Sequence, residues 1–67
     1  MKEYTNSEIA HAIDEYVHLE RDRAILKRRY IDGILLDPLA EEFDLSVRQI
    51  KNIIYKHSKK LFETFPF

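Results

Sequence analysis

The stretch LAEEFDLSVRQIKNII, residues 39–54, decides the fold of this chain. Its first half is acidic, its second half carries only positive charges, and Ser46 stands between the two. Ser46 is followed three residues later by Gln49, a pair that forms a capping box at the start of a helix. The stretch therefore predicts a short helix over 37–43 and a longer helix over 47–62.

The longer helix has two chemically distinct faces when its residues are placed on a helical wheel. Its apolar face holds Ile50, Ile53, Ile54, His57 and Leu61. Its opposite face holds Arg48, Lys51, Asn52, Tyr55 and Lys59, with Lys56 at the flank. The short helix before it turns Leu39, Ala40 and Phe43 inward, and the two are joined by a turn over 44–46. Positive charge is thus expected to form a stripe on the exposed face of one helix.

Two further helices are predicted upstream of this pair. Thr5 and Glu8 form a second capping box ahead of apolar residues at helical spacing, which predicts an acidic amphipathic helix over 5–18. The segment ERDRAILKRRYI predicts another helix over 20–32. Gly33 fits the end of that helix because glycine takes the left-handed conformation without a steric penalty.

The sequence signals for the start of the short helix and for the end of the chain are weaker than the two capping boxes. Pro38 fits only the first turn of a helix, where its missing N–H costs nothing, and Asp37 is expected to cap that helix. Residues 63–67 are expected to form a tail, and Phe62 is expected to dock on the core.

Length and composition place these helices in one small domain, residues 1–67. With 45% apolar residues, one glycine, two prolines and no cysteine, the chain is expected to be an all-α bundle of about four helices that contains a helix-turn-helix. No apolar run approaches the roughly 20 residues of a membrane span, and the start MKEYTNSE has no signal-peptide core. We therefore expect a soluble, cytoplasmic protein with no membrane partner.

Charge is distributed unevenly along the chain. The net charge of −1 combines an acidic first third, with one lysine against five acids in residues 1–20, and a basic segment. Residues 46–60 contain five basic residues and no acidic one. Such asymmetry indicates a polyanionic partner for the basic segment, although a lysine-rich surface that binds nothing gives the same pattern.

A short helix, a tight turn and a longer helix with a basic outer face are typical of DNA-binding helix-turn-helix proteins. A helix laid in the major groove presents its first exposed turns to base edges, where arginine can bond guanine and asparagine can bond adenine. Arg48, Lys51 and Asn52 are of the right types and lie on that face. Lys56 and the two lysines at 59–60 lie further along, nearer to backbone phosphates. The alternative is a packing unit that binds no DNA.

Residues 19–62 resemble region four of bacterial sigma factors of the sigma-70 type and the small helix-turn-helix proteins built on it. The segments that carry the resemblance are AILKRRYIDG at 24–33, LAEEFDLSVRQIKNI at 39–53 and KKLF at 59–62. The resemblance implies a domain of bacterial or phage origin that reads promoter DNA with its last helix and contacts RNA polymerase. The predicted base-reading residues are Val47, Arg48, Lys51 and Asn52. The predicted phosphate contacts are Arg29, Ser46, Tyr55, Lys56, Lys59 and Lys60.

The chain also departs from that family. Primary sigma factors carry charged residues at the position of Val47 and an acid at that of Arg48, so the DNA sequence they prefer does not transfer. The segment ILLDP at 34–38 replaces a polar entry into the third helix. A sigma factor also needs a promoter-melting module, for which 67 residues leave no room, so a complete sigma factor is not expected.

The sequence contains no pattern typical of catalysis, of a cofactor site or of a metal site. It has no glycine-rich phosphate loop and no cysteine, and Ser46 and Ser58 are expected at a cap or on a helix surface. His11, Glu15 and His18 share a face of the first helix, but a zinc site needs three or four ligands that close around the ion. We predict a protein that is not an enzyme and holds neither cofactor nor metal.

The leading hypothesis is a sequence-specific DNA-binding transcriptional regulator. The alternative is a protein-interaction module that binds RNA polymerase or a sigma factor without DNA, which the acidic first helix and the apolar segment 34–36 favour. Double-stranded DNA is the predicted partner; contact with RNA polymerase, a homodimer and pairing with a promoter-melting subunit remain open.

Overall fold

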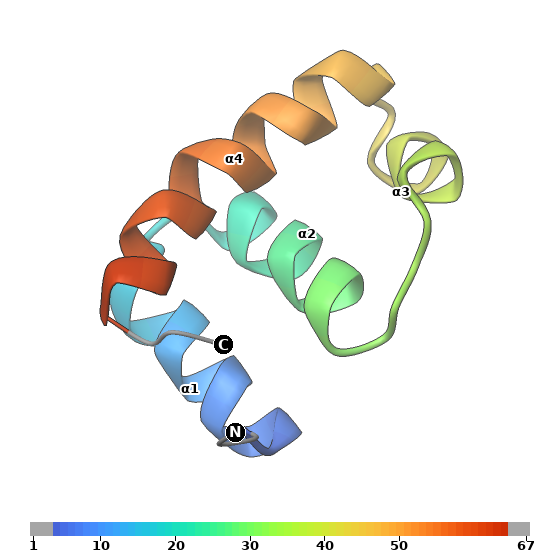
Figure 1. The fold of residues 1–67 in the computed structure, drawn as a ribbon. Coiled ribbons are helices and arrows are strands. Elements are labelled where there is room, and N and C mark those ends of the chain that lie inside the picture. The colour runs from blue at the N-terminus through green and yellow to red at the C-terminus, as the bar shows by residue number, and fades with distance from the viewer. Residues whose placement is uncertain (1–3, 65–67) are drawn as a thin grey trace.

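The computed structural model describes residues 4–64, which form four α-helices and no strand (Figure 1). The helices are α1 (Asn6–Tyr16), α2 (Glu20–Tyr30), α3 (Leu36–Phe43) and α4 (Val47–Thr64). The predicted all-helical bundle is thereby confirmed. No helix in this part of the chain is both long enough and apolar enough to cross a membrane. The side chain of Phe62, for which docking on the core is predicted, and residues 65–67 lie outside what the structure describes.

The helices are arranged around α2 and α4, which contact each other and both other helices. Figure 1 shows α4 running along one side of the bundle, from α3 at its start to α1 at its end. Between described residues, α1 and α3 make no contact. The two outer helices are therefore connected only through the pair α2–α4.

Two apolar clusters hold the bundle together, and α2 contributes one of two consecutive residues to each. The first cluster consists of Ala12, Ile13, Val17, Leu26 and Leu61. The second consists of Ile25, Leu39, Ala40 and Ile50. Ile54 on α4 packs against both clusters and so connects them. Burying a side chain of this size contributes about 1.5–3 kcal/mol, so these residues supply most of the favourable free energy of folding.

The first helix begins where the sequence predicts and ends earlier. Thr5 Oγ1 accepts a hydrogen bond from the Glu8 N–H, and the Glu8 carboxylate accepts one from the Thr5 N–H, both at 3.1 Å. The prediction that this helix reaches residue 18 is wrong, because Val17 takes an extended backbone conformation. Arg23 on α2 donates hydrogen bonds to the carbonyl oxygens of Val17 and Asp14, and so supplies donors to carbonyl groups at the end of α1. His18 consequently lies beyond the helix.

The predicted cap of the third helix is also wrong. Leu35, not Asp37, is the N-cap residue, and it makes no side-chain capping bond. Helix α3 starts at Leu36 because this side chain packs against the second cluster, and Asp37 is drawn into the first turn, where a negative charge is favourable. Pro38 stays within the first turn, as expected. Helix α2 ends at Tyr30 rather than at residue 32.

Polar contacts between α2 and α4 lie beside the apolar clusters. Asp22 is only 3% exposed, and its Oδ2 lies 2.8 Å from Nε2 of His57. Burial alone would raise the pKa of Asp22, but hydrogen bonds from His57 and Arg21 hold that pKa below its ordinary value. The hydroxyl groups of Tyr30 and Ser58 are hydrogen-bonded to each other. The prediction that Ser58 lies on the helix surface is wrong, because Ser58 is buried facing α2.

We expect Asp22→Asn to lower the free energy of unfolding by about 2–3 kcal/mol at pH 7, because the buried contact then loses its charge. A domain of this length has about 3–10 kcal/mol in total, so the loss is large. Since the folded-state pKa of Asp22 is depressed, its contribution is fully present above the unfolded pKa of about 4 and is lost as pH falls through the lower folded value. Urea denaturation followed by circular dichroism, at pH 7 and at pH 3, measures both effects.

The matched control is Asp14→Asn, which changes an exposed carboxylate paired with Lys27 at 2.7 Å. We expect it to change stability less than Asp22→Asn. Two results would contradict a stabilising role of the Asp22 charge. One is an equal loss of stability in the two variants, and the other is a loss in Asp22→Asn that is as large at pH 3 as at pH 7.

Candidate nucleic-acid interface

The start of α4 is fixed by the turn that precedes it. Asp44 takes a left-handed conformation with φ 55°, which a short polar residue tolerates, and it ends α3. The Gln49 N–H donates to Ser46 Oγ at 3.1 Å, and the Ser46 N–H donates to Gln49 Oε1 at 2.9 Å. The predicted capping box is thereby confirmed. It uses an acceptor position of the Ser46 hydroxyl and leaves its hydrogen available to an external acceptor.

One face of α4 is exposed along most of its length. The residues on it recur at helical spacing and are Arg48, Lys51, Asn52, Tyr55, Lys56, Lys59 and Lys60. Tyr55, in the middle of this set, is 76% exposed. Val47 differs from the others, because it is half-buried and packs against the second apolar cluster. We call the seven exposed residues the basic face.

The basic residues of α2 are engaged within the protein. Lys27 pairs with Asp14, and Arg28 pairs with Glu42 at 2.8 Å and Asp32 at 2.9 Å. These contacts raise the pKa of Arg28, mainly through its hydrogen bonds to Glu42 and Asp32. The other basic residues of the helix bond to Asp22 or to backbone carbonyl groups, and they are Arg21, Arg23 and Arg29.

Four cations of the basic face have no such acidic partners in the described part of the chain. Within residues 4–64, Arg48, Lys51, Lys56 and Lys59 have no acidic partner within ion-pair distance. The first turn of α4 contains no acidic residue either. Four positive side chains are therefore held on one helix face with their charges open to solvent.

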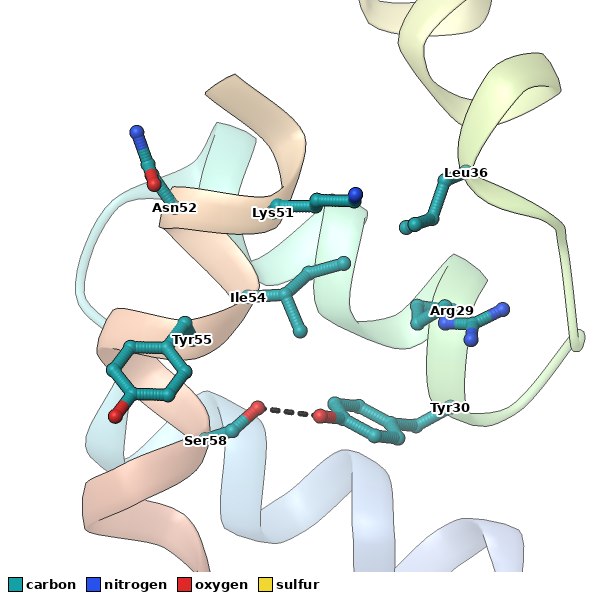
Figure 2. A pocket seen from close by; sticks show the side chains of 8 residues that line it. All are labelled: Arg29, Tyr30, Leu36, Lys51, Asn52, Ile54, Tyr55 and Ser58. Atoms are coloured by element: carbon teal, nitrogen blue, oxygen red, sulfur yellow. Dashed lines mark hydrogen bonds between the residues drawn. The ribbon is translucent and has the colours of Figure 1, made fainter. Parts of the chain in front are cut away.

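A groove lies beside the basic face, between α4, the end of α2 and the start of α3. It has a volume of about 580 Å³ and is lined by Arg29, Tyr30, Leu36, Lys51, Asn52, Ile54, Tyr55 and Ser58. In Figure 2, Lys51 extends toward Leu36 above Ile54, and the Tyr30–Ser58 hydrogen bond lies below Ile54. The predicted phosphate contact Arg29 is half-buried here, where its Nη1 donates to the Ile34 carbonyl oxygen at 3.1 Å. The structure thus brings Arg29 to the same groove as Lys51.

The sequence alone did not indicate this groove. Ile54 was expected only as a core residue, and Ser58 at a cap or on a helix surface. Leu36 belongs to the apolar segment 34–36, in which only Leu35 is strongly exposed, at 68%. A usable signal was the polar Ser58 four residues after Ile54, on the inward side of the helix.

Comparisons of the chain with protein-family models, curated proteins and solved structures found no match. The resemblance to sigma region four therefore remains a prediction that rests on the quoted segments.

We expect Ser46→Ala to lower the free energy of unfolding by about 1 kcal/mol, because the first turn of α4 loses its side-chain cap. Ser46→Asp is the control, since aspartate caps a helix as well as serine does. Thermal unfolding of the three proteins tests this. Equal loss in both variants would show that the hydroxyl matters for another reason than capping.

Proposed function

We propose that this protein is a sequence-specific DNA-binding transcriptional regulator of the cytoplasm, which places α4 in the major groove of double-stranded DNA. The observation that carries the proposal is that four cations of the basic face lack acidic partners in the described structure, whereas the cations of α2 are engaged. The four are Arg48, Lys51, Lys56 and Lys59. Phosphate groups of DNA would supply the missing negative charge, and the release of their counterions drives binding.

The order of residues along α4 supports this docking. Arg48, Lys51 and Asn52 occupy its first two turns and are exposed, which suits contact with base edges. Lys56, Lys59 and Lys60 follow in later turns and suit contact with phosphates. The half-buried Val47 would contribute at most an edge of its side chain, for example to a thymine methyl group.

The arrangement of the helices keeps the acidic helix away from these base-reading residues. Ile13 of α1 and Val17, just after that helix, share an apolar cluster with Leu61, near the far end of α4 (Figure 1). The start of α4, with Arg48, lies instead at the end of the bundle that α3 occupies. Repulsion between DNA and the acids of α1 is therefore weakest where the bases would be read.

Additional groups surround the proposed contact surface. The Ser46 hydroxyl hydrogen and the remaining N–H groups of Arg29 can bond phosphate oxygens. Tyr55 can donate its phenol hydrogen to the same strand, since it stands exposed between the lysines at 51 and 59. With about five phosphate contacts, the logarithm of the binding constant should fall with the logarithm of salt concentration with a slope near −4.5. A single copy with so few phosphate contacts is expected to bind DNA with modest affinity. Binding as a homodimer or together with RNA polymerase would raise that affinity.

Base reading predicts a loss of discrimination when α4 loses its first polar residues. Selection from random-sequence duplexes should enrich one motif with the parent protein. Arg48→Ala and Asn52→Ala should each weaken binding to that motif by about 1–3 kcal/mol and relax selection at particular positions. Fluorescence anisotropy with single-position variants of the selected duplex measures this. Failure of the folded parent protein to enrich any motif would overturn the proposal.

Phosphate contact predicts a different result for the later turns. The triple change of Lys56, Lys59 and Lys60 to alanine should weaken binding to selected and random duplexes by the same factor and reduce the salt slope by about 2.7. Lys27→Ala is the control, because it removes a positive charge from α2 that is paired with Asp14. A triple variant with an unchanged salt slope would show that these lysines do not meet DNA.

The second candidate function is a module that binds RNA polymerase or a sigma factor without DNA. Leu35, which is 68% exposed beside the start of α3, is the observation that favours it. Retention of purified RNA polymerase after nuclease treatment, lost in Leu35→Asp but not in Arg48→Ala, would support this candidate over DNA reading.

A further inference from the structure

The groove between α2 and α4 combines chemical features that DNA binding does not require. Its centre and lower side are apolar or internally bonded, since Leu36 and Ile54 line it and the Tyr30 hydroxyl is bonded to Ser58 (Figure 2). Its volume of about 580 Å³ falls within the range of roughly 300–1,000 Å³ that is typical of small-molecule sites. A phosphodiester strand would leave this apolar surface unused.

The polar lining of the groove has one sign of charge. Arg29 and Lys51 are its two charged residues, and none of the lining residues is acidic. Lys51 has no acidic partner within the described chain, and one Arg29 N–H is bonded to the Ile34 carbonyl, which holds the guanidinium in place. Asn52 and Tyr55 add neutral hydrogen-bonding groups on the side of α4.

We propose that this groove binds a small organic anion with an aromatic or branched apolar body. The carboxylate or similar head group lies between Lys51 and Arg29, and the apolar body covers Ile54, Leu36 and the ring of Tyr30. The positive charges of Arg29 and Lys51 favour an anion over a neutral or cationic ligand. The apolar surface decides for an organic anion over inorganic phosphate, which would gain nothing from Leu36 or Ile54.

Occupancy of the groove bears on the basic face because the two share residues. Lys51, Asn52 and Tyr55 belong both to the groove and to the face proposed to meet DNA. A bound anion neutralises the charge of Lys51 and places negative charge next to the surface proposed to contact DNA phosphates. This consequence rests on the proposed function: the anion acts as an effector that releases the protein from DNA, whereas the ligand site itself stands without it.

The probe for the site is 1-naphthoate, and its uncharged counterpart is 1-naphthalenemethanol. Titration of the ¹⁵N-labelled full chain, followed by amide chemical shifts, should show saturable binding of 1-naphthoate with a Kd on the order of 1 mM. The largest shifts should fall on Tyr30, Leu36, Ile54, Tyr55 and Ser58. The alcohol should bind about tenfold more weakly, because it leaves Lys51 and Arg29 without a charged partner.

Two lysine variants of α4 distinguish binding in the groove from nonspecific attraction of the anion to a positively charged helix. Lys51→Met keeps the length of the side chain and should raise the Kd for 1-naphthoate about five- to tenfold. Lys56→Met removes the same charge from α4 outside the groove and should change the Kd less than twofold. Equal effects of the two variants, equal binding of acid and alcohol, or shifts away from the groove would each overturn the proposal, as would no saturation by 10 mM.

A second arm tests the effector role with the selected DNA duplex. Saturating 1-naphthoate should raise the DNA Kd of the parent protein about fivefold or more, whereas 1-naphthalenemethanol at the same concentration should leave that DNA Kd nearly unchanged. If the protein binds no DNA, the proposed function fails while the titration still decides the ligand site. If both ligands bind independently, the site stands and the effector role is wrong.

Discussion

The rotation of α4 about its own axis depends on a contact between two side chains that lie 35 residues apart, Asp22 and His57. A carboxylate that is 3% exposed is costly to bury without hydrogen-bond partners, and His57 supplies one of them beside Arg21. The next residue, Ser58, then meets Tyr30. Apolar clusters tolerate small rotations of a helix, whereas directional hydrogen bonds do not. These contacts therefore determine which residues of α4 are left outside.

Two basic helices in this small domain use their charges in opposite ways. In α2, Lys27 and Arg28 pair with acids of α1, α3 and the adjoining turn, so they connect neighbouring elements. In α4, Arg48 and Lys51 meet no acid within the described residues. Both helices are rich in basic residues, so composition alone does not distinguish them. The contacts show which cations are paired within the protein and which are available to a partner. A basic cluster in a sequence therefore indicates binding only after its internal partners have been accounted for.

Short-range signals predicted much of the fold, and long-range contacts account for what was missed. The capping boxes at Thr5 and Ser46 involve residues three apart, so the sequence contains both partners side by side. The exposed face of α4 followed from periodicity for the same reason. The Asp37 cap failed because packing of Leu36 moved the helix start, and no local signal reports that packing. The groove joins three helices and requires their spatial arrangement.

The basic face lowers the stability of the helix that carries it. Arg48 and Lys51, like Lys56 and Lys59, are like charges three residues apart, and each such pair destabilises a helix by a few tenths of a kcal/mol. A single acid among them would remove part of this repulsion, yet in the described part of α4 the only acid is Glu63, near the end of the helix. Anions bound to this face would relieve the repulsion, so under the proposed function this sequence exchanges stability of the free protein for affinity. Lys51 contributes to that exchange twice, because it is presented both to the outer face and to the groove.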